Sequence, residues 1–155
     1  MTFQYDAYVT AALFGKAGTA AFALGDGTVR FESGETIEAH DGAILSACAH
    51  PSGEGVITGG DDGRVVWSRV SGAEEIAKVP GRWIDAVAAS GESKLIAFAA
   101  GRELHVRDAS DPKFARVFTH EKSVADVAFD PKGRRIAAAT YNGAWLWYAK
   151  IAEQK

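Results

Sequence analysis

Two pairs of side chains have types and spacings that suit nucleophilic or metal chemistry. Cys48 and His50 lie two positions apart, so on a strand they share a face, as a thiol–imidazole pair or part of a metal site requires. His40 and Asp41 read as half of a catalytic dyad. A metal site needs three or four ligands, however, and no Ser or Cys occupies a sharp strand-to-helix turn. We therefore predict no catalytic residue, no metal ligand and no cofactor.

Carboxylates are the other candidates for chemistry. Asp61 and Asp62 have the oxygen ligands that Ca²⁺ prefers, but Asp62 with Gly63 is also a hairpin sequence, which accounts for Asp62 without a metal. Asp85 and Asp126 stand at what we take to be matching positions in runs that are otherwise mostly Ala, Val, Ile and Ser. Their matching positions favour a shared structural role.

The segments that hold these residues are repeated. The signature GDGTVRF at 25–31 returns as DDGRVVW at 61–67 and, in weaker form, as GRELHV at 101–106 and YNGAWLW at 141–147. If Val29, Val65, Leu104 and Trp145 are equivalent, the repeats are spaced by 36, 39 and 41 residues. Spacings in this range are typical of β-propeller blades.

Each repeat predicts antiparallel strands joined by tight turns. Short apolar or alternating runs are separated by Gly, Asn, Asp or Ser, and no segment predicts a helix. Asp26-Gly27, Asp62-Gly63 and Asn142-Gly143 suit two-residue hairpins with positive φ angles. We expect four strands in each repeat.

Composition excludes several classes of function. The 155 residues fit one domain, with 47% hydrophobic and 24% charged residues, and 17 basic against 20 acidic side chains give a net charge of −3. Without a basic surplus, neither nucleic acid nor an anionic membrane is an expected partner. A single cysteine makes no internal disulfide, and no signal sequence or membrane-spanning run is evident. We expect a cytoplasmic protein.

Two repeats carry motifs of a known family. The second has His40, then AHPSG at 49–53 and VITGGDDGRVVWS at 56–68, and the fourth has His120, VAFDPKG at 127–133 and NGAWLWY at 142–148. Across essentially the whole chain, the sequence resembles the WD-repeat β-propellers. It departs from their pattern where Ser68 follows Trp67 in place of Asp, and where Phe31 and Val106 replace the tryptophan.

The resemblance implies a network of hydrogen bonds that locks each blade, from a loop His to a turn Asp, a strand Ser or Thr and a third-strand Trp. Such a set is self-consistent, because each buried polar group supplies a partner to another. The expected members are His40, Thr58, Asp62 and Trp67 in the second repeat, with His120, Asn142 and Trp147 as a partial set in the fourth.

The resemblance also implies an all-β fold with four blades, at about 8–40, 41–81, 82–121 and 122–155, each of four antiparallel strands. Rings of this family usually close with seven or eight blades, so four blades make a half propeller with unpaired edges and an exposed apolar face. A homodimer then completes an eight-bladed ring. Residues 1–7 are expected to act as a closing strand, because the fourth blade has few residues left for its outermost strand.

The expected function is that of a non-catalytic protein-interaction scaffold that associates with itself. Three alternatives remain open: the chain is a fragment or designed half of a longer propeller whose partner is the missing half; it binds another partner or closes as a four-bladed ring; or it is a lactonase-like hydrolase with a channel metal. Partner contacts are expected on one rim, with Tyr141 on the opposite rim. The rim residues are Arg82, Trp83 and Lys122.

Overall fold

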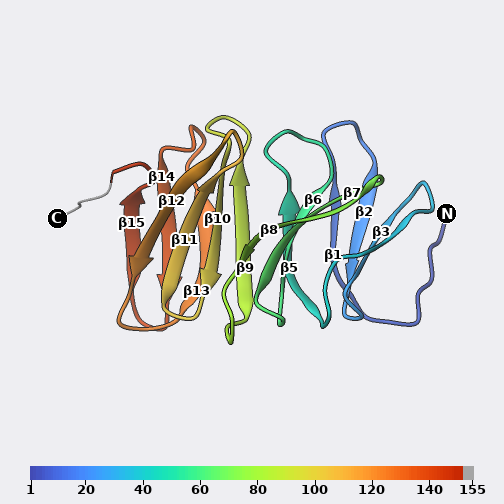
Figure 1. The fold of residues 1–155 in the computed structure, drawn as a ribbon, viewed down its shortest axis with the longest axis horizontal. Coiled ribbons are helices and arrows are strands. Elements are labelled where there is room, and N and C mark those ends of the chain that lie inside the picture. The colour runs from blue at the N-terminus through green and yellow to red at the C-terminus, as the bar shows by residue number, and fades with distance from the viewer. Residues whose placement is uncertain (152–155) are drawn as a thin grey trace.

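The computed structural model describes residues 1–151, which form four antiparallel sheets and contain no helix (Figure 1). The prediction of an all-β fold built from four blades is confirmed. Among residues 1–151 there is accordingly no helix able to cross a membrane. The first blade contains β1 (Val9–Phe14), β2 (Ala20–Leu24), β3 (Thr28–Phe31) and β4 (Thr36–Glu38); the second contains β5 (Ile44–Ala49), β6 (Val56–Gly60), β7 (Arg64–Arg69) and β8 (Gly72–Lys78).

The third and fourth blades continue the same up-and-down order. The third contains β9 (Ile84–Ser90), β10 (Leu95–Ala100), β11 (Glu103–Asp108) and β12 (Asp111–Thr119), and the fourth contains β13 (Val124–Phe129), β14 (Arg135–Thr140) and β15 (Ala144–Tyr148). The fourth blade therefore has three strands among the described residues, one fewer than predicted. Its expected outer strand falls mainly on residues 152–155, which lie outside the described part.

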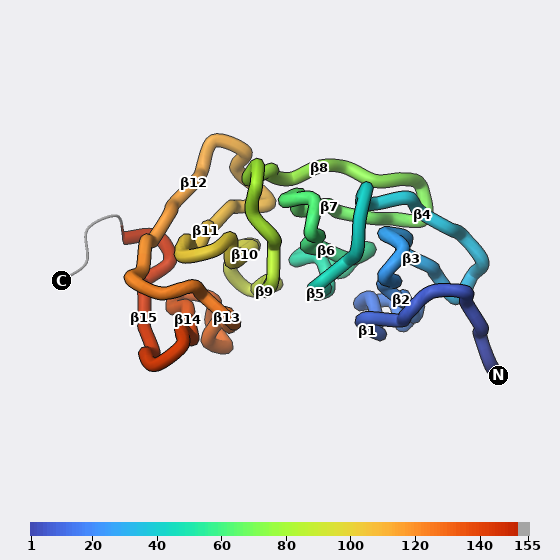
Figure 2. Tube along the Cα trace, turned by 90° about the horizontal axis from the view of Figure 1, so that it is seen from below, coloured from blue at the N-terminus to red at the C-terminus, as the bar shows by residue number. Residues whose placement is uncertain are grey.

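The blades form an open arc. Figure 2 shows β1, β5, β9 and β13 along the inner edge, with the other strands of each sheet fanning outward and the two termini at opposite ends. We call the ends at which the inner strands begin the first rim and the other ends the second rim. The first rim also carries the turns between the second and third strands of every blade, because the strands alternate in direction.

Two hairpins on the first rim depend on glycine. Gly27 has φ 87° and Gly63 has φ 78°, and a Cβ atom on either would lie 2.4 Å from a backbone oxygen. The aspartate before each glycine has no positive φ, so these are longer turns that end in a left-handed glycine and not the two-residue turns predicted. The turn that holds Asn142 and Gly143 contains no positive φ at all.

Each blade has two faces, since neighbouring side chains on a strand point to opposite sides of the sheet. We call the face toward the next blade the trailing face and the face toward the preceding blade the leading face. Between the first and second blades, trailing Ala21, Val29 and Phe31 pack on leading Val56 and Val66. Apolar clusters of the same kind join the second blade to the third and the third to the fourth.

Every inner strand contains the same irregularity. The pairing register of each inner strand with its neighbour shifts between its first and third residues. A β-bulge of this kind leaves one residue outside the ladder. The four bulged residues are Thr10, Leu45, Asp85 and Ala125, and all four are exposed.

Candidate functional site

The second blade is locked by a buried histidine. His40 precedes β5, and its Nδ1–H donates to Asp62 Oδ1 over 2.9 Å. Its Nε2 lies 2.8 Å from the hydroxyl of Thr58. Asp62 also accepts hydrogen bonds from the backbone N–H groups of Asp41 and Arg64, both at 3.1 Å. The loop before the blade is thereby tied to the β6–β7 hairpin.

The carboxylate of Asp62 is the charged member of this network. Burial alone would raise the pKa of Asp62, but hydrogen bonds from His40 and from the N–H groups of Arg64 and Asp41 outweigh that effect. Its pKa therefore lies below the ordinary value, and the group is ionised at neutral pH.

Trp67 lies outside this network, contrary to the prediction. Thr58 pairs with Val66 in the β6–β7 register, whereas Trp67 pairs with Ile57, so its side chain points to the trailing face. There the indole donates to the carbonyl of Glu54 over 2.8 Å and stacks on the ring of His50 at 3.8 Å between centroids. The side chain that follows Trp67 on the leading face is that of Ser68.

Among its described residues, the fourth blade has the tryptophan of the expected network and lacks the acid and the hydroxyl. Trp147 Nε1 donates to His120 Nε2 over 3.0 Å, and His120 Nδ1–H donates to the carbonyl of Arg102 over 3.1 Å. These partners fix the tautomer, because Nε2 must accept and Nδ1 must carry the hydrogen. Trp147 also stacks on Phe118 of the third blade at 4.6 Å. Asn142 is exposed in its turn and does not join His120.

Register explains why the two tryptophans differ. In the second blade Gly59 pairs with Val65, and its equivalent in the fourth blade, Ala139, pairs with Ala144. The β14–β15 turn is therefore one residue shorter, and Ala144, not Trp145, is the equivalent of Val65. This shift places Trp147 on the leading face, at the position of Ser68.

The predicted rim residues gather on one rim. Trp83 is 62% exposed just before β9, and Arg82 and Lys122 are exposed in the loops that precede β9 and β13. Tyr141 is 90% exposed. The prediction that Tyr141 lies on the opposite rim is wrong, because Thr140 pairs with Val124, the first residue of β13. All four side chains are thus on the first rim.

Cys48 and His50 do not form a reactive pair. Cys48 packs into the apolar cluster between the second and third blades, where burial raises the pKa of its thiol to about 12. His50 binds the hydroxyl of Ser52 at 2.8 Å. Burial, and then the charges of Arg69 and Lys94, lower the pKa of His50 to about 4. A thiol that stays protonated is a poor nucleophile and a poor metal ligand.

The carboxylates are also scattered. Asp85 is the bulged residue of β9, whereas Asp126 is the third residue of β13 and pairs with Ala139, so the two positions do not match as predicted. Among residues 1–151, no three His, Cys, Asp or Glu side chains are placed to hold one metal ion.

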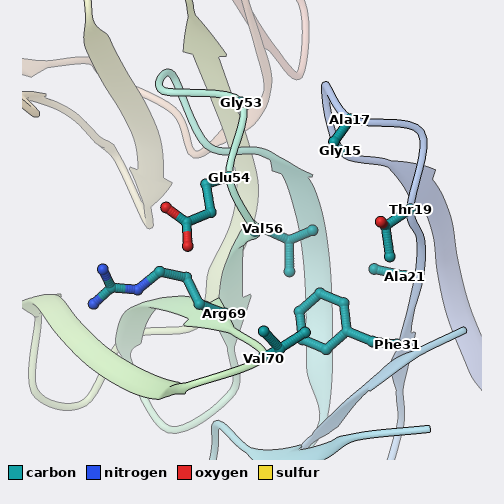
Figure 3. A pocket seen from close by; sticks show the side chains of 11 residues that line it. Gly15, Ala17, Thr19, Ala21, Phe31, Gly53, Glu54, Val56, Arg69 and Val70 are labelled. Atoms are coloured by element: carbon teal, nitrogen blue, oxygen red, sulfur yellow. The ribbon is translucent and has the colours of Figure 1, made fainter. Parts of the chain in front are cut away.

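A small pocket opens on the second rim between the first and second blades (Figure 3). Phe31, Val56 and Val70 form its apolar part, and Glu54 and Arg69 form its charged part. Its volume is about 150 Å³. Pockets for small molecules usually occupy about 300–1,000 Å³, so this one suits a few water molecules or a single side chain.

The trailing face of the fourth blade is an uncovered apolar surface at one end of the arc. We call it the closing face. A shallow depression of about 480 Å³ lies on it, and Leu146 is 68% exposed. The closing face is formed by Asp126, Ala128, Ala137, Ala139, Ala144 and Leu146.

The closing face repeats the pattern of a buried face. Across the third blade, Ala88, Ala97 and Val106 pair in a row on the trailing face, where the fourth blade covers them. The equivalent row of the fourth blade is Ala128, Ala137 and Leu146, and all three are exposed. The closing face thus has the side chains of a blade–blade interface but no blade against it.

Comparisons with known proteins agree with this architecture. Residues 32–67 and 112–147 match the family model of the WD domain, G-beta repeat. The crystal structure of Sqt1 from Chaetomium thermophilum is similar over 99% of this chain, with a TM-score of 0.76 and 18% sequence identity. At that identity the likeness concerns the fold alone. The chain spans 48% of the length of Sqt1, and no curated protein sequence matches it.

Proposed function

We propose that the chain is a non-catalytic scaffold for protein–protein interaction that completes its ring with a second copy of itself, because two of its segments match the WD-repeat family model and its fold is that of half a propeller. Stacked blades hold the rim loops rigidly, and loops on a rigid frame are where binding residues usually lie. Arg82, Trp83, Lys122 and Tyr141 on the first rim are the proposed partner contacts, since exposed Trp, Tyr and Arg are common anchors of protein interfaces.

One observation carries the self-association. Exposed Ala128, Ala137 and Leu146 on the closing face are equivalent to Ala88, Ala97 and Val106, which the next blade buries. Burying apolar surface of this kind stabilises by about 25 cal/mol per Å². A blade packed on the closing face would bury apolar surface there, and would be stabilised in the same way as the fourth blade is by packing on the third.

The second copy fits because the chain itself carries the complementary face. The leading face of the first blade has a row of Ala12, Phe22 and Arg30. In the fourth blade the equivalent row is Val127, Ala138 and Trp145, of which Val127 and Ala138 pack on the third blade. Two copies related by a two-fold axis form two contacts between a closing face and a leading face, and so close a ring of eight blades. Together the two copies have about the length of the Sqt1 chain, of which one copy spans 48%.

Light scattering on the purified chain tests the proposal. We expect about twice the chain mass of 16.4 kDa for the wild type and a monomer for Leu146→Glu, which places a charge on the closing face. Val117→Glu is the matched control, because Val117 is 49% exposed on the outer strand β12 and should leave the dimer intact. A wild type that stays monomeric at high concentration contradicts self-association and favours a fragment whose partner is another half.

A further inference from the structure

The leading face of the first blade is not bare. Residues 1–7, which we call the N-terminal strap, lie outside the four sheets at the end of the arc (Figures 1 and 2). The rings of Phe3 and Tyr5 contact Phe22 at 5.7 and 6.2 Å between centroids. The guanidinium of Arg30 lies over Tyr5 at 5.3 Å. The role of residues 1–7 as a closing strand stays a prediction, since in the single chain they form none.

The strap occupies the row that a neighbouring blade would need. Phe22 is equivalent to Thr58, Phe98 and Ala138, and each of these lies on a face covered by the preceding blade. Leu24, beside Phe22 on the same strand face, is fully buried, whereas Ala12 and Phe14 of β1 remain exposed. The strap thus covers the middle of the face and leaves its inner edge open.

We infer that the N-terminal strap competes with the closing face of a second copy for the leading face of the first blade, so that strap release sets the strength of ring closure. This inference rests on the proposed self-association. Phe3 and Tyr5 occupy the place where Ala137 and Leu146 of the second copy would pack. The strap and the second copy therefore cannot contact Phe22 at the same time. The two ends of the arc are therefore unequal: one is open and the other must be uncovered first.

The competition has a simple quantitative form. If only molecules with a released strap close the ring, the apparent dissociation constant is the intrinsic one divided by the released fraction. Aromatic pairs and a cation–π contact together hold the strap, and each is a weak interaction. Loss of both aromatic rings should release most of the strap and tighten the dimer about tenfold.

Sedimentation equilibrium on the full chain tests the inference. The double substitution Phe3→Ala with Tyr5→Ala should lower the apparent dissociation constant about tenfold relative to wild type. Gln4→Ala is the matched control, since it lies between the two aromatics and should leave the constant unchanged.

The outcomes separate the two proposals. A wild-type dimer that Leu146→Glu disrupts, with a double variant that dimerises no more tightly, overturns the competition and leaves self-association in place. A double variant that dimerises more weakly also overturns it, and points to a strap that belongs to the ring. If neither wild type nor double variant dimerises, self-association itself is wrong.

Discussion

The second and fourth blades solve the same problem with different parts. In the second, buried His40 is held by Asp62 and Thr58, and the tryptophan is absent from the network. In the fourth, His120 is held by Trp147 and a backbone carbonyl, and the acid and the hydroxyl are absent. A loop histidine therefore needs two partners of the right polarity, and their chemical identity can change between repeats.

The difference is also one of charge. Asp62 is an anion that accepts three hydrogen bonds in a partly buried site, whereas the contacts of His120 involve only neutral groups. Removing one partner of a buried charged group costs more than removing one partner of a neutral hydrogen bond. The two blades should accordingly respond differently to equivalent substitutions.

Asp62→Ala should have the largest effect. It leaves the ring of His40 and the N–H groups of Asp41 and Arg64 without their acceptor, and we expect a loss of about 3 kcal/mol in the free energy of unfolding. Urea unfolding followed by circular dichroism measures it. Asp61→Ala is the matched control and should cost under about 0.5 kcal/mol. Equal losses for the two variants would contradict the stabilising role of the hydrogen bonds that Asp62 accepts.

Trp147→Phe should cost less, about 1 kcal/mol, since an aromatic ring still stacks on Phe118 and only the donor to His120 is lost. Trp67→Phe in the second blade removes a donor to an exposed carbonyl and should cost about half as much. The same urea experiment compares them. A larger loss for Trp67→Phe would mean that contacts on the trailing face contribute more to the free energy of unfolding than the hydrogen bond of Trp147 to His120 does.

A pH effect should distinguish the surroundings of the two tryptophans. The pKa of His50, stacked on Trp67, is lowered to about 4, so the unfolded chain binds a proton more readily than the folded one. Stability from this group is complete above about pH 6.5 and is lost as the pH falls toward 4. We expect the melting temperature to fall by about 5–10 °C between pH 7 and 4.5.

The control for this pH effect is His50→Phe, which keeps a ring beside Trp67 and does not titrate. Its melting temperature should fall less over the same interval in differential scanning fluorimetry. Identical pH profiles for the variant and the wild type would show that other groups, such as His105, account for the whole effect.

Asn142→Ala should have the smallest effect, within about 0.5 kcal/mol, because Asn142 is exposed and takes no part in the His120 network. Thermal unfolding measures it against wild type. A loss of 2 kcal/mol or more would show that the turn of the fourth blade has the locking role that Asp62 has in the second.

Much of the fold could be predicted from the sequence because each repeat is defined by short-range sequence patterns. Asp-Gly turns, short apolar runs and a spacing of about 40 residues predict four sheets without any long-range information. The association of His40, Thr58 and Asp62 followed from the family pattern. The hairpin type did not, since only the glycine of each Asp-Gly pair adopts a positive φ.

The faces of the tryptophans could not be predicted by the same means. A strand alternates with a period of two, so one residue more or less in the preceding turn moves a side chain to the other face. The β14–β15 turn is shorter by one residue than the β6–β7 turn. Neither motif, DDGRVVW or YNGAWLW, indicates which register the two strands adopt. The contact of the strap with Phe22 is a tertiary contact with no sequence periodicity behind it.

The bulges of the inner strands have a consequence for how this protein can vary. Thr10, Leu45, Asp85 and Ala125 stand outside their ladders, exposed, at the same place in all four blades. In the part of the chain that the structure describes, the side chains of Leu45, Asp85 and Ala125 form no hydrogen bond or ion pair with the frame. The hydroxyl of Thr10, by contrast, donates to the carbonyl of Ala23 over 3.0 Å. The arc therefore presents a column of side chains along its hollow, three of which selection or an engineer can replace one blade at a time without loosening the frame.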